Sequence, residues 1–238
     1  MSSSRAEILG KIKLSLAKPA LPHHHGHREI TDDTQQLFRS ASARDNLVEK
    51  FRTEFEQVSG EFIHPASDEA AAQNLCELIQ NAGVQTVAIS AHEICRRVHL
   101  EEALKTVTPE VQILREVIDS ESSLERRRLK NSLSHVQLSI TGAEFLIAES
   151  GTILVFSGDQ ASRQISLLPT IHVVLATPRQ IYPNLAEVFQ EIQKASGSTL
   201  PGSTQTLITG PSRTADIEKV LIRGVHGPTR IVTIMLEA

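Results

Sequence analysis

Glu149 is the first candidate for covalent or acid–base chemistry in this sequence. It stands in the run AESGT, residues 148–152, between two apolar runs. A carboxylate that is desolvated between buried strands has a raised pKa unless it is paired, and such a group can act as a nucleophile or a general base. The alternative is a tight corner in which Glu149 accepts hydrogen bonds from backbone N–H or hydroxyl groups. The spacing leaves both interpretations open.

A second candidate site follows a predicted strand near the end of the chain. The segment TGPSRT, residues 209–214, leads from that strand into a helix predicted over 214–222. A glycine-containing turn at a helix start presents free N–H groups and the positive end of the dipole to an anion. Arg213 can bind a carboxylate or phosphate through two hydrogen bonds. The alternative is helix capping, with Ser212 or Thr214 as the N-cap and acidic residues complementing the dipole.

A histidine in a turn is the third candidate. His226 lies in the run GVHGP, residues 224–228, which predicts a tight turn before the last strand. It can act as an acid or base near neutral pH, and the alternative is a structural or solvated side chain. Arg163 can add a positive charge to an anion pocket, although spacing alone does not show it. The candidate ligand-binding residues are Ser150, Gly151, Thr152, Arg163, Gly210, Ser212, Arg213, Thr214 and His226.

The chain offers few metal ligands. Residues 23–27 hold four histidines, which can bind a metal, but Pro22 and Gly26 favour a mobile loop instead. Cys76 and Cys95 are the only cysteines, fewer than the four thiolates that an iron–sulfur cluster or a four-cysteine zinc site needs. We therefore assign no metal and no cofactor to this chain.

Composition and missing motifs exclude several protein classes. The 238 residues carry a formal net charge of -4, and 3% of them are aromatic. Nucleic-acid-binding proteins usually show a basic excess and stacking aromatics, so no nucleic-acid partner is expected. The sequence lacks GxxxxGK(S/T), GxGxxG after a strand, GxSxG and HExxH. Because no secretory signal and no membrane-spanning apolar run is visible, we expect a cytoplasmic protein.

Hydrophobic periodicity predicts helices at the beginning of the chain and alternating strands and helices after it. A helix with Ser67 as its N-cap is expected to end before Gly83, and the apolar runs around Glu149 predict a hairpin. Further helices are predicted over 5–17, 33–57, 101–107, 123–131, 178–195 and 214–222, and strands over 61–64, 84–89, 111–114, 136–140, 171–176, 206–208 and 231–236. This order predicts an α/β fold with a mostly parallel sheet.

Five motifs occur in a fixed order in the second half of the chain. They are ITGAE at 140–144, AESGT at 148–152, Arg163 followed by SLLP at 166–169 and IHVV at 171–174, LITGPSRTADIE at 207–218, and GVHGP at 224–228. Together they resemble the LUD-domain family and, within it, the lactate utilization protein C branch. The resemblance covers residues 60–238, which we predict to form a LUD α/β domain after a helical N-terminal extension with a His-rich loop, residues 1–59.

The resemblance implies a fold and a function. The fold is a three-layer α/β/α architecture similar to CoA transferases, ribose-5-phosphate isomerase and formyltetrahydrofolate cyclo-ligase. The function is that of a subunit of an iron–sulfur-dependent system that oxidises L-lactate to pyruvate. Its partners are lactate utilization proteins A and B, the cysteine-rich subunits that hold the clusters.

A weaker analogy concerns the Glu-Ser-Gly run itself. Residues 149–151 are similar to the motif whose glutamate accepts the acyl group in CoA transferases, and this similarity suggests a catalytic Glu149. The alternative function is therefore a free-standing enzyme or binder of a small anionic ligand in a CoA-transferase-like pocket. The ligand classes considered are a CoA thioester, a sugar phosphate, a nucleotide and a folate.

Overall fold

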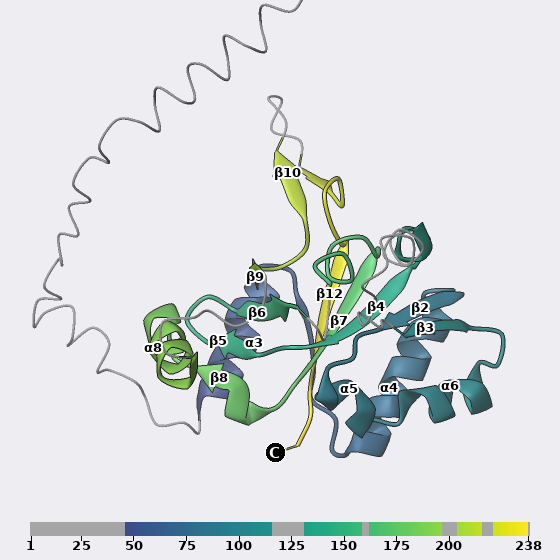
Figure 1. Ribbon diagram of the computed structural model, residues 1–238, viewed down its shortest axis with the longest axis horizontal. Helices are drawn as coiled ribbons and strands as arrows, with labels where there is room; N and C mark the ends of the chain where they lie inside the picture. Colours follow the sequence, from purple (N-terminus) through teal and green to yellow (C-terminus); the bar gives the residue numbers. More distant parts are fainter. Residues whose placement is uncertain (1–45, 116–130, 159–161, 197–203, 216–220, 238) are drawn as a thin grey trace, which may run out of the picture. The chain divides into compact units, whose positions relative to one another are not determined.

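A six-stranded parallel sheet forms the centre of the protein (Figure 1). The computed structural model describes residues 46–115, 131–158, 162–196, 204–215 and 221–237, which belong to one compact unit. In spatial order the strands are β1 (Glu61–Ile63), β12 (Arg230–Met235), β7 (Ile171–Ala176), β4 (Leu138–Gly142), β2 (Thr86–Ile89) and β3 (Gln112–Arg115). Every neighbouring pair is parallel, which confirms the predicted α/β class.

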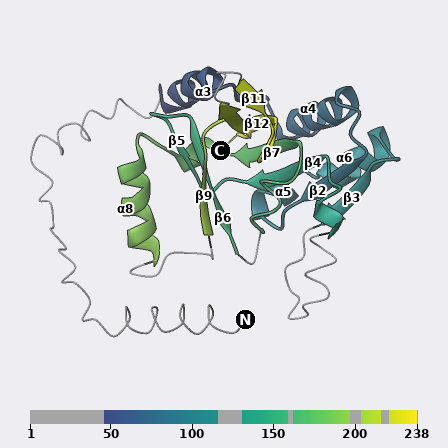
Figure 2. The same ribbon diagram turned by 90° about the horizontal axis from the view of Figure 1, so that it is seen from above.

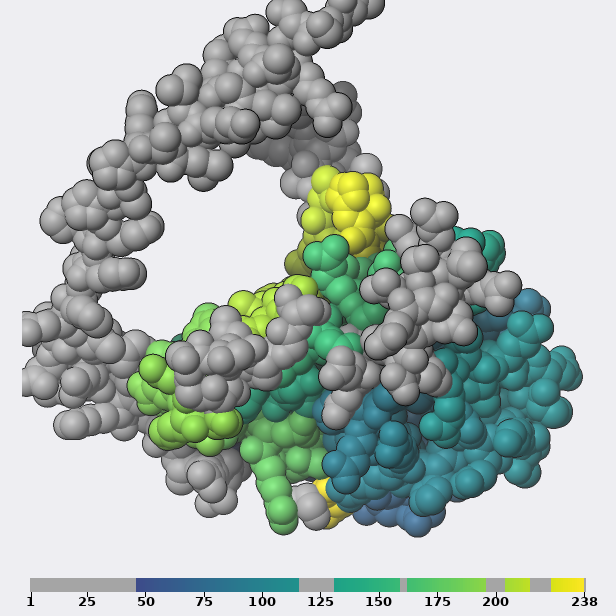
Figure 3. All heavy atoms as spheres, viewed as in Figure 1, coloured from purple at the N-terminus to yellow at the C-terminus, as the bar shows by residue number. Residues whose placement is uncertain are grey.

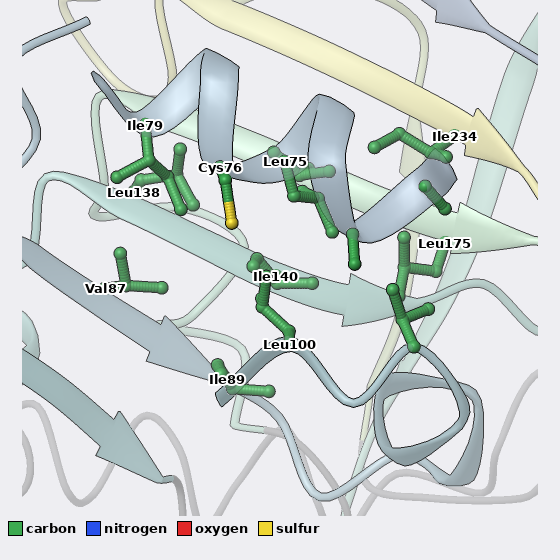
Figure 4. Packing of buried hydrophobic residues seen from close by; sticks show 14 of the residues in the cluster. Leu75, Cys76, Ile79, Val87, Ile89, Leu100, Leu138, Ile140, Leu175 and Ile234 are labelled. Carbon is green, nitrogen blue, oxygen red and sulfur yellow. The ribbon is translucent and has the colours of Figure 1, made fainter. Parts of the chain in front are cut away.

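Three helices cover one face of this sheet. They are α4 (Asp68–Asn81), α5 (Glu93–Arg97) and α6 (Leu100–Val107). Figure 4 shows Leu75, Cys76 and Ile79 of α4 directed toward the strands, where they share one buried cluster with Leu138 and Ile140. The apolar stripe of α4 therefore holds the helix on the sheet.

The ends of α4 follow from the residues that flank it. The Ser67 hydroxyl accepts a hydrogen bond from the Ala70 N–H at 3.2 Å, so Ser67 is the N-cap that the sequence predicts. Gly83 follows the helix with a φ of +62°, a conformation that glycine adopts without steric cost. Both boundary predictions are confirmed.

A second, four-stranded sheet covers the other face. Its strands, in order, are β8 (Ile181–Tyr182), β5 (Phe145–Ile147), β6 (Thr152–Ser157) and β9 (Thr204–Ile208). The helix α3 (Leu47–Gln57) packs there, because its fully buried Phe51 and Phe55 share a cluster with Leu146 of β5 and Val174 of β7. The helix α8 (Leu185–Ser196) lies on the outer side of this sheet (Figure 2).

The helix predicted over 178–195 begins later in the structure than the sequence suggested. The helix predicted over 178–195 is in fact a short 3-10 turn, η2 (Pro178–Gln180), followed by β8 and only then by α8. Ile181 and Tyr182 pair with β5, and the Asn184 side chain accepts a hydrogen bond from the Glu187 N–H at 3.0 Å. Because residues 181 and 182 pair with β5, the helix begins only after Asn184, whose side chain caps it.

Several predictions lie outside the described residues. They are the helix over 5–17, the histidines at 23–27, the first part of the helix over 33–57 and most of the helix over 123–131. The boundary near residue 59 stays a prediction, and α3, which precedes it, packs in the α/β unit.

Candidate functional site

The Glu-Ser-Gly motif forms the corner of the predicted hairpin. The strands β5 and β6 pair antiparallel, and Ile147 lies opposite Thr152. Gly151 has a φ of +57°, and a Cβ atom added there would lie 2.3 Å from the backbone nitrogen of Phe55. Only glycine lets the corner approach α3 so closely, so the motif first serves a packing role.

Glu149 caps a helix at this corner. Its side chain is exposed, and its Oε1 atom accepts a hydrogen bond from the Leu185 N–H at 3.1 Å. The carboxylate thus lies at the start of α8, where the helix dipole favours a negative charge. This geometry matches the hydrogen-bonded corner that the sequence left open as an alternative. The desolvation on which the nucleophile interpretation depends is not present at an exposed side chain, so a catalytic role for Glu149 stays a prediction.

A chain of hydroxyl groups joins two of the five motifs. The Oγ atom of Ser150 lies 2.7 Å from Oγ1 of Thr152, which lies 2.8 Å from Oγ1 of Thr209. Gly210 has a φ of +78° and approaches the carbonyl oxygen of Val58, which a Cβ atom there would meet at 2.4 Å. The hairpin corner and the start of the fourth motif therefore meet beside the end of α3.

The prediction of a helix after Gly210 is wrong. Arg213–Ala215 is a strand, β10, which pairs antiparallel with β11 (Leu221–Arg223). The Ser212 N–H donates to the Pro228 carbonyl at 2.9 Å, and the Ser212 carbonyl accepts from the Gly224 N–H at 3.0 Å. These bonds hold the segment extended, so neither a helix N-terminus nor its dipole is available to an anion at Ser212, Arg213 and Thr214.

The remaining candidates lie at the amino ends of the parallel strands. The turn at 224–228 is formed as predicted, and the Thr229 N–H at its end donates to the Thr170 carbonyl just before β7. Arg163, Arg213 and His226 are all exposed there. Among the described residues no hydrogen bond or ion pair joins these three side chains. The space-filling view shows the yellow atoms of this region well separated from the blue and teal atoms of α4 to α6 (Figure 3).

Two titratable side chains whose pKa is shifted by burial, one fully buried and one half-buried, were not among the candidates. His172 of β7 has no exposed surface, and burial lowers its pKa to about 4. Glu144 follows β4 and accepts a hydrogen bond from the Phe156 N–H at 2.7 Å, and burial raises its pKa to about 7. A signal for His172 was available, because a polar residue inside the apolar run of a central parallel strand is buried on either face.

His172 belongs to a polar cluster on the face that meets the second sheet. Its Nε2 atom lies 2.9 Å from the Thr141 hydroxyl, and Ser139 lies beside it on β4. Within the described ranges, His172 Nδ1 and the hydroxyls of Ser139 and Thr233 are buried without a hydrogen-bond partner. Such groups can hold internal water, since each unpaired buried polar atom is costly.

The described part of the chain contains no group of three or more His, Cys, Asp or Glu side chains arranged to hold a metal ion. Cys76 and Cys95 are buried free thiols, and burial raises the pKa of Cys95 to about 11. A thiol with this pKa is not ionised near neutral pH, which disfavours metal binding or nucleophilic chemistry. No helix in the described ranges is long and apolar enough to cross a membrane.

Comparisons with known proteins place these motifs in a family. The model of the LUD domain matches residues 48–236. The chain is 38% identical over 125 residues to lactate utilization protein C of Halalkalibacterium halodurans, which covers 52% of this chain and 54% of that protein. It is 40% identical over 99 residues to lactate utilization protein C of Bacillus subtilis, 41% of each chain. The chain thus matches about half the length of these curated relatives.

A further relative and a solved structure extend the coverage. The uncharacterized protein YkgG of Escherichia coli is 29% identical over 172 residues, 72% of this chain and 71% of that protein. The crystal structure of a DUF162 family protein from Deinococcus radiodurans superposes with a TM-score of 0.55 at 19% identity, covering 82% of this chain and 99% of that one. That structure shares the fold. Because the family model spans most of the chain, the chain belongs to the LUD-domain family.

Proposed function

We propose that this chain supports lactate utilization as a subunit of an iron–sulfur-dependent system that oxidises L-lactate to pyruvate. The observation that carries the proposal is the LUD-domain match over residues 48–236, together with relatives named lactate utilization protein C. In this proposal the clusters belong to the partners, lactate utilization proteins A and B, in the cytoplasm. The presence of only two cysteines in the chain is consistent with that division.

An exposed apolar surface supports the partner-binding part of the proposal. Leu168 and Val225 are 48% and 49% exposed, and Leu167 is 36% exposed. They lie on two loops that the Thr229 to Thr170 hydrogen bond joins. Large exposed apolar side chains that gather in one place are typical of protein interfaces.

The charge of the same surface suggests the chemistry of the partner. The segments 162–170, 209–214 and 224–229 contain Arg163, Arg213 and His226 but no Asp or Glu. An acidic protein surface with apolar residues at its centre would complement them. We therefore place the contact with protein A or B on this surface, which we call the amino-edge surface.

Growth on L-lactate tests the functional role. A host that lacks this gene should fail to grow on L-lactate, and the wild-type chain should restore growth. If deletion leaves growth intact in a host without another lactate dehydrogenase, the proposal is wrong. Complementation with Glu149→Ala and Arg213→Ala at equal protein level asks whether the sequence-predicted site residues are needed.

Co-purification with proteins A and B tests the surface. Leu168→Glu should abolish co-purification, because it places a like charge against an acidic partner. Leu207→Glu is the matched control, since Leu207 is 47% exposed but lies on β9 in the second sheet. Equal binding by both variants would exclude the amino-edge surface, whereas no binding by the wild type would contradict the complex itself.

A second candidate function is the binding or turnover of a small anionic ligand in a CoA-transferase-like pocket. The hydroxyl groups of Ser150, Thr152 and Thr209, which lie within hydrogen-bond distance of one another, favour it, because hydroxyl groups can donate to an anion. The ligand classes to test are a CoA thioester, a sugar phosphate, a nucleotide and a folate. Binding of any one by the wild type and its loss in Arg213→Ala would support this function.

A further inference from the structure

A cavity of about 770 Å³ opens at the carboxyl ends of three central strands. It is lined by a segment that follows β2 and includes His92 and Arg96, and by a segment that follows β7 and includes Thr177, Arg179 and Gln180. Its volume lies in the range of small-molecule sites. None of the residues that the sequence motifs pointed to lines it, so it is a different place on the molecule from the amino-edge surface.

The topology of the sheet makes this edge a favourable place for a ligand. β2 and β4 are neighbours, but the chain leaves them toward opposite faces. After β2 it enters α5, whose Cys95 joins the cluster under α4, and after β4 it reaches Ala143, which joins the cluster with the second sheet. In open α/β sheets ligands bind in the crevice that forms where neighbouring strands diverge in this way.

Gly142, at the end of β4, makes room for the side chain of His92. A Cβ atom added to Gly142 would lie 2.2 Å from Nδ1 of His92, so the His92 ring occupies the space over the end of the strand. The same nitrogen accepts a hydrogen bond from the Ile94 N–H at 3.2 Å, which places the ring proton on Nε2. Burial lowers the pKa of His92, so near neutral pH the ring is an uncharged donor at the cavity wall.

The opposite wall is held in place by hydrogen bonds. The Gln180 side chain accepts from the Thr177 N–H at 2.7 Å and donates to the Ala143 carbonyl. The turn η2 is therefore fixed at both ends, and Arg179 projects from a well-anchored segment. Because this segment is already ordered, it loses little conformational entropy when Arg179 binds a ligand.

The charged residues of the lining are Glu93, Arg96, Arg97 and Arg179, so positive charges outnumber the single negative charge. Arg97 is paired with Asp68, whereas neither Arg96 nor Arg179 makes an ion pair with any described residue, and both are exposed. Two unpaired guanidinium groups thus flank one cavity, one from α5 and one from η2. Guanidinium groups bind carboxylate and phosphate groups through paired hydrogen bonds.

We propose that this carboxyl-edge cavity binds a small organic oxyanion, a carboxylate or a phosphate, between Arg96 and Arg179, with Nε2 of His92 as a further donor. The inference does not depend on the lactate role, because it rests on the geometry of the cavity alone. It names a different arginine from the CoA-transferase-like pocket, so variants can distinguish the two.

Titration calorimetry of the full chain with pyruvate and with inorganic phosphate tests the proposal. We expect at least one of these probes to bind the wild type, and Arg96→Ala and Arg179→Ala each to raise Kd about tenfold or more. Arg52→Ala is the matched control, because it removes an exposed arginine of α3 that lines neither the cavity nor the amino-edge surface, and Kd should stay within about twofold of wild type.

The outcomes are decisive in both directions. Binding of pyruvate without phosphate assigns a carboxylate ligand, and the reverse assigns a phosphate ligand. The proposal is overturned if neither probe binds, or if Arg213→Ala weakens binding while Arg179→Ala does not. Circular dichroism of each variant establishes that the fold is retained. A negative result here leaves the growth experiment on L-lactate unaffected, so the two proposals fail separately.

Discussion

His172 and Glu144 should make the stability of this protein depend on pH in opposite directions. Burial lowers the pKa of His172 from 6.5 to about 4. Burial also raises the pKa of Glu144 from 4.5 to about 7, although the hydrogen bond from the Phe156 N–H favours the carboxylate. Near pH 5.5 both groups are therefore uncharged in the folded protein and charged in the unfolded chain.

The signs follow from the protons that each state binds. Between about pH 4.5 and 6.5 the unfolded chain holds one more proton at His172, so this group makes the free energy of unfolding rise by about 1.4 kcal/mol per pH unit. The folded protein holds one more proton at Glu144, so that group makes it fall by about the same amount. In the wild type the two contributions nearly cancel.

Urea unfolding of single variants separates the two contributions. Relative to wild type, Glu144→Gln should gain about 2 to 3 kcal/mol of stability between pH 4.5 and 6.5, because only the His172 contribution remains. His172→Asn should lose about as much over the same range. The Gln side chain at position 144 can still accept a hydrogen bond from the Phe156 N–H. A change in packing would shift the free energy of unfolding equally at every pH and would not change its slope with pH. Profiles that run parallel to wild type would refute the reasoning.

Two backbone positions and one cap give further expected outcomes, all measurable by chemical denaturation. Gly151→Ala should destabilise the protein more than Gly83→Ala. Both positions have a positive φ, but only at Gly151 would an added Cβ atom meet the backbone of Phe55. Equal decreases in the free energy of unfolding would contradict the close approach. Ser67→Ala should cost about 1 kcal/mol through loss of the α4 cap, and Ser67→Asp should retain most of it; an unchanged midpoint for Ser67→Ala would contradict the capping role.

Local signals in the sequence were sufficient where neighbours along the chain decide the structure. Ser67 and Gly83 set the two ends of α4, because an N-cap side chain and a residue with positive φ act on the backbone groups nearest to them in the sequence. The hairpin at Gly151 is likewise a local feature. The helix predicted over 214–222 failed because Ser212 is held by Pro228 and Gly224, two partners more than ten residues away. Long-range strand pairing overrides local propensity at such positions.

The cavity at the carboxyl edge shows why the site could not be predicted from the sequence. His92 and Arg179 come from loops 87 residues apart by their numbers, and they meet only because β2 and β7 flank β4 in the sheet. All six strands of the central sheet could be recognised from their apolar runs, but the sequence does not state their spatial order. Motif reasoning therefore selected residues such as Arg213 and His226, which lie at the amino ends of the strands. Once the order of the strands is known, sheet topology favours a ligand site where β2 and β4 diverge. The cavity lies there, over the end of β4, and its two flanking arginines, Arg96 and Arg179, form no ion pair with any described residue.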